Sequence, residues 1–159
     1  MHHPRPTPGI RNPFQLIAAL PSDPDGDGPE DRGVRPIEQL GTQQRLLLVE
    51  DEFLLSMVLM EDLRAAGYDV LGAGATVSAA MDAVRSQSFG AAILDINLKG
   101  EMVYPVAEEL ARRRIPFLFL SGYALANMPE RFRSYPRLAK PADWTLLLRE
   151  VQGMLRPKS

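Results

Sequence analysis

The amino-acid sequence predicts an α/β domain, with a five-stranded parallel sheet and helices on both of its faces. After Arg45, short apolar runs alternate with stretches of helical periodicity, which is typical of strands joined by crossover helices. Four of the apolar runs end on polar residues, which parallel strands would bring together at one edge of the sheet. The expected strands are 45–50, 68–72, 90–95, 116–120 and 136–139, and the expected helices are 52–66, 76–87, 103–113, 127–133 and 142–155.

The composition limits the classes of function. The chain has 159 residues, of which 45% are hydrophobic and 24% charged, as expected for one soluble globular domain with an extension. A net charge of −2 and a pI near 5.7 argue against direct DNA binding, because DNA-binding proteins usually carry a basic excess. The lack of cysteine excludes disulfides and thiolate catalysis, and no apolar run has the length of about 20 residues that spans a membrane. We therefore expect a cytoplasmic protein.

Residues 1–44 are rich in proline and glycine and show no sustained periodicity, which predicts a disordered extension. The exception is Asn12–Leu20, an apolar stretch that could form two helical turns against another surface. At the other end, the last expected helix lies close to the C-terminus. We therefore expect this domain to pass on whatever it detects or carries by contact, and not through an attached effector domain.

The first expected helix carries apolar residues on two faces. One set recurs at i, i+3 and i+4 spacing and predicts the stripe that packs on the core: Leu55, Val58, Leu59, Leu63 and Ala66. Phe53, Met57 and Met60 fall on the opposite face, where a solvated helix should be polar, and predict a partner surface. The alternative is that these three residues contact another part of the chain, such as Asn12–Leu20.

Three carboxylates follow two of the expected strands. Glu50 and Asp51 come at the end of the first strand and Asp95 at the end of the third, so all three should meet at the carboxyl edge of the sheet. Carboxylates at short range repel one another unless a divalent cation lies among them. Oxygen ligands suit Mg²⁺, which commonly binds through one or two carboxylates and phosphate oxygens. The pattern predicts a Mg²⁺ site at which a phosphoryl group approaches an aspartate nucleophile.

Two further polar groups end the fourth and fifth expected strands. Lys140 is one of only three lysines, and its ammonium could pair with Asp95 at rest and with a phosphoryl oxygen afterwards. Ser121 offers a hydroxyl that could donate to the same phosphoryl group. The bond from Lys140 to Pro141 could be cis, which would help to aim the lysine inward. The joint order and spacing of these groups indicate a phosphoryl-binding site, which none of them indicates alone.

With these motifs, LLLVEDE, AAILDINL, PFLFLSGY and LAKP, residues 45–157 resemble the receiver domain of two-component response regulators. The resemblance implies a flavodoxin-like fold with strand order 2-1-3-4-5. It implies that Asp95 accepts a phosphoryl group from a histidine of a histidine kinase or a histidine phosphotransfer protein and later loses it to water. It implies no enzyme activity beyond this self-phosphorylation and autodephosphorylation. A downstream protein target would then respond to the phosphorylated state.

The resemblance also implies roles for the site residues. Four of them would hold Mg²⁺, through carboxylates, a bridging water or a main-chain carbonyl: Asp51, Asp95, Glu50 and Asn97. Ser121 and Lys140 would bind the phosphoryl group. Asn97 and Tyr123, two residues beyond Asp95 and Ser121 respectively, occupy the positions that in this family tune the lifetime of the phosphate.

The runs PFLFLSGY and DINLKGE further resemble the single-domain FAT GUY subgroup of receivers, whose signature reads PFxFATGY. Leu120 and Ser121 replace its Ala-Thr, and the serine keeps the hydroxyl. Ordinary receivers carry a tyrosine or phenylalanine three residues before the lysine, but this position is Arg137 here. We therefore expect a different switch, or one in which Tyr123 or Tyr135 takes the place of that aromatic residue.

Other interpretations of the sequence have less support. A hydrolase of the aspartyl-phosphate type would show D-x-D-x-T, where this chain has Asp95-Ile96-Asn97, and would need a cap over the substrate. Dinucleotide binding rests only on Gly72-Ala73-Gly74, which lacks the third glycine of the motif. The main alternative is a receiver fold that acts as a phosphorylation-independent protein-binding module.

Overall fold

The computed structural model describes residues 44–122 and 127–158. The expected extension up to residue 43, with its Asn12–Leu20 segment, and Tyr123 lie outside the described residues. The disorder predicted for that extension therefore stays a prediction. In the part of the chain that the structure describes, no helix has both the length and the apolar character needed to span a membrane.

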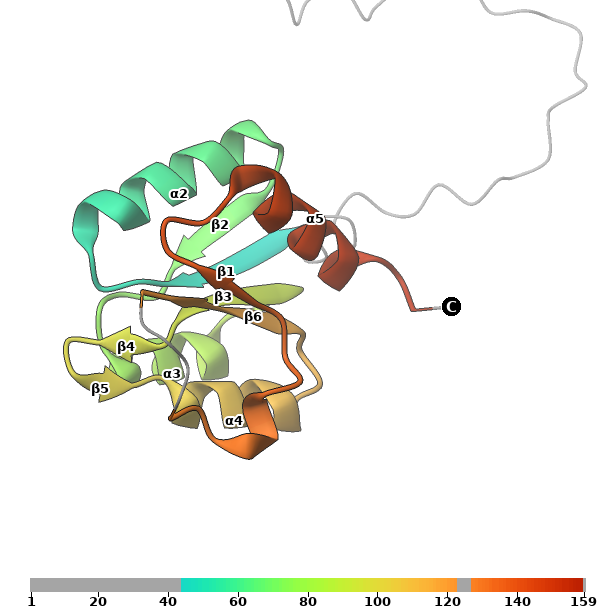
Figure 1. Ribbon diagram of the computed structural model, residues 1–159. Coiled ribbons are helices and arrows are strands. Elements are labelled where there is room, and N and C mark those ends of the chain that lie inside the picture. The colour runs from blue at the N-terminus through green and yellow to red at the C-terminus, as the bar shows by residue number, and fades with distance from the viewer. Residues whose placement is uncertain (1–43, 123–126, 159) are drawn as a thin grey trace, which may run out of the picture. The chain divides into compact units, whose positions relative to one another are not determined.

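Five parallel strands form one sheet in the predicted order (Figure 1). From one edge to the other they are β2 (Asp69–Gly72), β1 (Arg45–Val49), β3 (Ala91–Asp95), β6 (Phe117–Ser121) and β7 (Arg137–Ala139). The central strands are apolar and buried over nearly their whole length, because helices cover both faces of the sheet. The predicted flavodoxin-like topology is confirmed.

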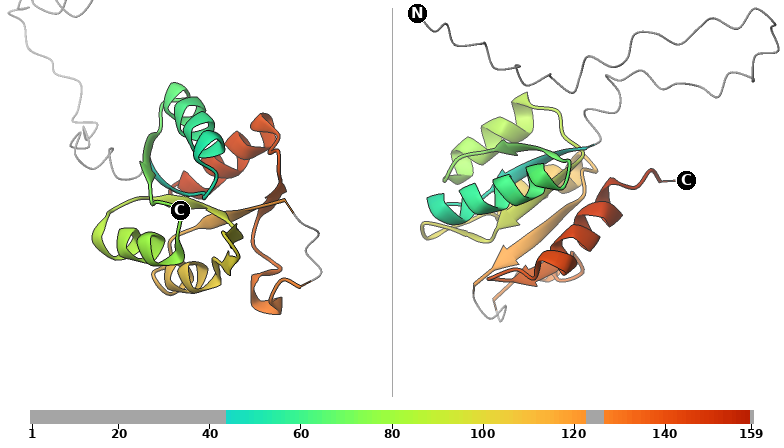
Figure 2. Two further views of the ribbon diagram at one scale, coloured as in Figure 1. Left: turned by 90° about the vertical axis from the view of Figure 1, so that its left-hand side faces the viewer. Right: turned by 90° about the horizontal axis from the view of Figure 1, so that it is seen from above.

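Helices of the described residues lie on both faces of the sheet, as Figure 2 shows from two further directions. They are α2 (Phe53–Ala65) and α5 (Trp144–Leu155) on one face, and α3 (Val77–Ser86) and α4 (Tyr104–Arg112) on the other. Successive residues of a strand point to opposite faces. Leu46 and Leu48 therefore join the core under α2 and α5, whereas Leu47 and Val49 join the core under α3 and α4.

The core-facing side of α2 differs in part from the predicted stripe. Leu59 and Leu63 are buried, and Leu55 packs against the same core, as predicted. The prediction is wrong for the other two members of the stripe, because Val58 is 54% exposed and Ala66 is the exposed C-cap residue.

Met60 was predicted on the partner surface, and this is also wrong, because it packs against the core. Gly72 on β2 leaves room for its side chain: Met60 Sδ lies 3.4 Å from the point that a Cβ on Gly72 would occupy. Four apolar residues remain exposed near the start of the helix, and we call them the α2 apolar surface: Phe53, Leu54, Met57 and Val58.

The prediction of a helix at 127–133 is wrong. Within this segment, the structure describes only the 3-10 turn η1 (Glu130–Phe132). Pro129 disfavours helical backbone at Met128, so a helix here could begin only at Pro129 or after it, and the structure forms a 3-10 turn in its place. Met128 and Phe132 are nevertheless buried in the core under α3 and α4. The segment therefore keeps its packing role without a full helix.

A small antiparallel hairpin that the sequence analysis did not predict follows β3 directly. It pairs β4 (Asn97–Leu98) with β5 (Glu101–Met102). Lys99 and Gly100 form its turn with φ angles of 53° and 90°. Positive φ at both central residues defines a type I′ turn, which matches the twist of a two-residue hairpin.

The basic run Arg112–Arg114 closes α4. Arg112 Nη2 and Arg113 Nε both contact Glu109 Oε1, at 2.7 and 2.6 Å. Hydrogen bonds from these two arginines hold the pKa of Glu109 down at about 2. Two of the three arginines therefore complete a helix end, which agrees with the preference of cations for the C-terminus of a helix.

Candidate phosphoryl and metal site

The strand registers bring the predicted site residues to one edge of the sheet. Val49 lies opposite Leu94, so Glu50 and Asp51 leave β1 at the level where Asp95 ends β3. Asp95 in turn lies opposite Leu120, next to Ser121. Ser121 lies opposite Ala139, so Lys140 follows at the same edge. Residues far apart in the sequence thus meet because their strands are parallel and all end here.

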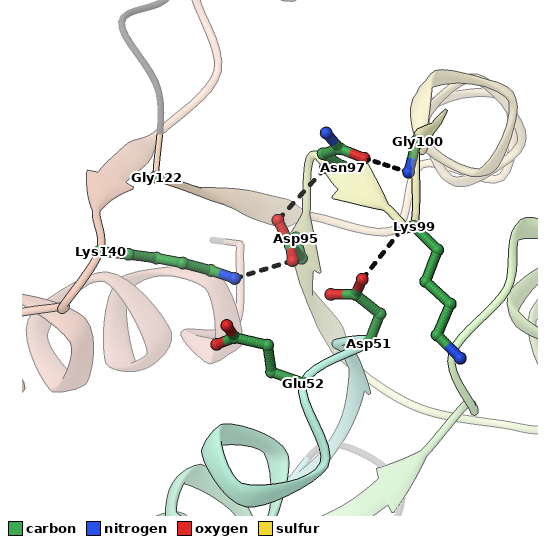
Figure 3. Close-up of a pocket in the computed structure, with 8 residues that line it drawn as sticks. All are labelled: Asp51, Glu52, Asp95, Asn97, Lys99, Gly100, Gly122 and Lys140. Atoms are coloured by element: carbon green, nitrogen blue, oxygen red, sulfur yellow. Dashed lines mark hydrogen bonds and ion pairs between the residues drawn. The ribbon is translucent and has the colours of Figure 1, made fainter.

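Lys140 forms ion pairs with two buried carboxylates. Its Nζ lies 2.7 Å from Asp95 Oδ2 and 2.8 Å from Glu50 Oε2, and Figure 3 shows the side chain reaching toward Asp95. Burial alone would lower the pKa of Lys140, but its contacts with the negatively charged carboxylates of Asp95 and Glu50 outweigh burial, so the pKa is raised. The Lys140–Pro141 bond is cis, as predicted.

Burial changes the proton affinity of both carboxyl groups. Glu50 is 4% exposed and Asp95 5%. Loss of solvation raises the pKa of Glu50 to about 6, although Lys140 and the N–H of Glu52 oppose the rise. The same cause raises the pKa of Asp95, against the effect of Lys140. The single ammonium of Lys140 therefore does not offset the loss of solvation of the two carboxylates.

The three acids present a donor set that fits a divalent cation. Glu50, Asp51 and Asp95 each offer an oxygen, and these atoms lie within 4.8 Å of one another. Glu50 Oε2 is buried, and its contact with Lys140 is an ion pair without hydrogen-bond geometry. This oxygen can therefore still coordinate a cation. Carboxylate oxygens in this number suit a hard cation such as Mg²⁺.

Asp51 differs from the other two acids because it is only partly buried. Burial would raise its pKa, but hydrogen bonds outweigh burial and the pKa is lowered, first among them the bond from the main-chain N–H of Lys99 to Asp51 Oδ2 at 2.9 Å. Asp51 therefore stays ionised and ready to accept a cation at neutral pH.

Asn97 lies between Asp95 and the turn of the hairpin. Its N–H donates to Asp95 Oδ1 at 3.2 Å, and its side-chain Oδ1 accepts from the N–H of Gly100 at 2.7 Å (Figure 3). The pocket around these groups has a volume of about 480 Å³, enough for a phosphoryl group and the waters of a metal ion.

The remaining predicted site residues are placed as follows. Ser121 is buried at the end of β6, and its carbonyl accepts the N–H of Lys140 at 2.9 Å. Arg137 is exposed on β7, and its Nη1 donates to the carbonyl of Arg133 at 3.4 Å. Tyr135 stacks on Phe117, with ring centroids 4.4 Å apart and an interplanar angle of 12°. Tyr123 lies outside the described residues.

Three residues that line the pocket were missed from the sequence: Glu52, Lys99 and Gly100. Glu52 follows the acidic pair directly, and this third acid was a signal for its position. The Lys-Gly pair between two short polar-apolar segments was a signal for the turn, since glycine is common at turns that need positive φ.

Solved structures of two proteins are similar to this chain. One is the solution structure of SdrG from Sphingomonas melonis Fr1, with 38% identity and a TM-score of 0.63 over 71% of this chain and 97% of that chain; SdrG in its BeF3-activated conformation is 36% identical. The other is the PhyR response regulator REC domain from Erythrobacter litoralis, with 26% identity and a TM-score of 0.64 over 76% of this chain and 98% of that chain.

Comparison with curated proteins gives the transcriptional regulatory protein PdtaR of Mycobacterium tuberculosis, 29% identical over 97 residues, which are 60% of this chain and 47% of PdtaR. The chain thus spans about half the length of the curated relatives that it matches. No family model matches the chain. The coverage of SdrG and the placement of the acids and lysine lead to one assignment: the chain belongs to the receiver-domain family of two-component response regulators, and its likeness to SdrG and PhyR fits the FAT GUY subgroup.

Proposed function

We propose that this receiver accepts a phosphoryl group on Asp95 from a histidine kinase or a histidine phosphotransfer protein, with Mg²⁺ as cofactor. The observation that carries the proposal is the ion pairing of Lys140 with Asp95 and Glu50 beside a third carboxylate, Asp51. A buried lysine against an aspartate at a sheet edge is an arrangement that can accept and then neutralise a phosphoryl group. The phosphorylated domain would signal through protein contacts, relay the phosphate to another histidine, or drain it from a kinase.

The residues have defined tasks in the transfer. An oxygen of Asp95 attacks phosphorus, the P–O bond to Asp95 forms, and the P–N bond to the donor histidine breaks with its electron pair left on nitrogen. Lys140 can follow the negative charge from Asp95 to the phosphoryl oxygens, because its stem is flexible and its contacts are ionic. Ser121 would donate its hydroxyl to another phosphoryl oxygen. Mg²⁺, held by Glu50, Asp51, Asp95 and the carbonyl of Asn97, would supply the charge neutralisation that phosphoryl transfer requires.

The reaction would end with attack of water on the acyl phosphate of Asp95. Asn97 and Tyr123 are proposed to set how fast this happens, Asn97 from beside Asp95. Self-phosphorylation and autodephosphorylation would be the only chemistry. The proposal includes a cytoplasmic location and action through proteins without direct DNA binding. It is supported by the similarity to SdrG, which adopts a BeF3-activated conformation.

Intact-mass analysis after incubation with Mg²⁺ and a small phosphodonor such as acetyl phosphate tests the proposal directly. We expect the gain of one phosphoryl group, and its loss in Asp95→Asn. Beryllofluoride, which imitates the phosphoryl group, should bind the wild type in a Mg²⁺-dependent way. Failure of both phosphorylation and beryllofluoride binding would overturn the proposal.

The second candidate, a binding module that works without phosphorylation, is favoured by the α2 apolar surface. Phe53 is 74% exposed and Leu54 76%, and they line a groove beside Glu52. A contiguous exposed apolar patch of this kind is typical of interaction sites. A partner that binds wild type and Asp95→Asn with equal affinity, in the presence and absence of beryllofluoride, would support this candidate.

A further inference from the structure

We propose that the Lys99–Gly100 turn is a positioning device for the metal ligand Asp51, acting through the main-chain N–H of Lys99. The inference rests on the proposed function, since it concerns the Mg²⁺ site. Its main observation is the hydrogen bond from this N–H to Asp51 Oδ2 at 2.9 Å, which links residues 48 positions apart in the sequence.

Asp51 needs such a support because of its position. It is in a bend between the end of β1 and the start of α2, and it is more exposed than Glu50 and Asp95. Regular strand hydrogen bonds do not fix a residue there. The bond from Lys99 fixes one oxygen of the carboxylate, and Figure 3 shows the other oxygen turned toward Asp95. One carboxylate oxygen of Asp51 thus accepts the hydrogen bond from Lys99, and the other is directed into the site.

The turn itself is firmly anchored. Leu98 is 2% exposed and Val103 is buried, so apolar side chains hold both ends of the hairpin. The N–H of Val103 donates to the carbonyl of Ile96 at 2.9 Å, and the N–H of Gly100 to Asn97 Oδ1 at 2.7 Å. A rigid hairpin can therefore hold the Lys99 N–H at a set place relative to β3.

The same hairpin carries Asn97, whose carbonyl is the fourth proposed metal ligand. Asn97 begins β4, two residues after Asp95 and two before Lys99. The hairpin therefore connects three proposed ligands: it begins with Asn97, Asp95 lies two residues before it in the chain, and Lys99 in its turn holds Asp51 by a hydrogen bond. The geometry of the metal site should depend on the shape of this turn.

The backbone of Lys99, and not its ammonium, is the active part. Figure 3 shows the Lys99 side chain directed away from the carboxylates. Its φ of 53° is in the left-handed region, which asparagine tolerates and β-branched residues resist. This difference separates the role of the backbone from that of the charge, because Lys99→Asn and Lys99→Val both remove the ammonium.

Mg²⁺ titration followed by amide chemical shifts should give nearly the same Kd for wild type and Lys99→Asn. For Lys99→Val we expect binding weaker by about tenfold, because a β-branched residue disfavours the turn. Equal affinities for the Asn and Val variants would overturn the inference while leaving the proposed function in place. A wild type that does not bind Mg²⁺ would instead overturn the metal site itself, and this inference with it.

Hydrogen exchange of the Lys99 amide provides a readout that needs no metal and no destabilised turn. The amide should exchange slowly in wild type and Lys99→Asn, and at least about tenfold faster in Asp51→Ala, where its acceptor is gone. Unchanged exchange in Asp51→Ala would overturn the inference, because the contact would then not exist in solution.

Discussion

At the scale of single residues, Lys140 decides the balance of charge in the site. Glu50, Asp51 and Asp95 bring three carboxylates together, and Lys140 contacts two of them. Because burial already raises the pKa of Glu50 and Asp95, any loss of this ammonium increases the cost of their charges. A divalent cation and the ammonium together would neutralise the three acids.

Lys140→Met should lower the free energy of unfolding in EDTA at pH 7 by about 1–3 kcal/mol, because two buried carboxylates lose their charged partner. It should also slow the gain of phosphoryl mass by about 100-fold, as the loss of one preorganised electrostatic group often does. Lys99→Met is the matched control, since Lys99 lines the same pocket but its side chain points away. Equal losses in the two variants, measured by urea unfolding, would contradict the role of Lys140.

Glu50 should make the metal-free protein less stable as the pH rises. Its pKa is raised from 4.5 to about 6, so the folded state holds this proton more tightly than the unfolded chain. Stability that depends on the proton is lost between those two pH values, about 2 kcal/mol in all. Urea unfolding in EDTA at pH 4.5 and pH 7 should show this loss in wild type relative to Glu50→Gln. A difference that does not change with pH would refute it.

At the scale of elements, α2 has two different faces. Leu63 is fully buried against the sheet, whereas Leu54, on the same helix, is 76% exposed. The core side comes from Leu55, Leu59, Met60 and Leu63, which pack under β1, β2 and α5. The residues on the exposed side do not pack against the core, so we expect them to contribute little to the stability of the fold.

Leu63→Ala should therefore cost about 2–5 kcal/mol of the free energy of unfolding, through lost burial and a cavity. Leu54→Ala removes the same atoms from the surface and should change stability by no more than about 0.5 kcal/mol. Chemical denaturation of both variants is a direct comparison. A large cost for Leu54→Ala would show that the α2 apolar surface is covered in solution.

The sequence predicted the elements whose apolar pattern is long enough to recognise or whose ends carry polar residues. The five strands were found from short apolar runs, four of which end on polar residues, and four of the helices were found because their residues show helical spacing. The helix predicted at 127–133 is wrong because Met128 and Phe132 keep a helical spacing although Pro129 disfavours helical backbone at Met128. The hairpin was missed because paired strands as short as β4 and β5 carry no measurable period.

The candidate site was predictable to the extent that it depends on strand ends. Glu50, Asp51, Asp95 and Lys140 follow strands, and parallel pairing brings them together. Lys99 was not predictable in this way, because its contact to Asp51 runs through a main-chain N–H in a left-handed conformation. Such a contact does not depend on the chemistry of the side chain and leaves little trace in the sequence.

At the scale of the whole molecule, two cores share one sheet. The site lies at the carboxyl edge of that sheet, where β1, β3, β6 and β7 all contribute to it. A ligand that ties these strand ends together should therefore stabilise the whole fold. This stabilisation arises because such a ligand binds the folded state and not the unfolded chain.

Mg²⁺ with beryllofluoride should raise the midpoint of thermal unfolding. At a free concentration about 100 times the Kd, the expected gain is about 2.7 kcal/mol. Asp95→Asn should lose the part of this gain that comes from beryllofluoride. If the variant gains as much as the wild type, the ligand binds somewhere other than at Asp95.

Trp144 opens α5, just after Lys140 and the cis bond to Pro141. It is the one tryptophan of the chain and is 37% exposed. Trp144 is thus partly exposed to water, and a short segment connects it to the lysine that faces Asp95. The fluorescence of Trp144 should therefore change in wavelength or intensity when Lys140 shifts. The protein thus contains an intrinsic fluorescent probe of the site.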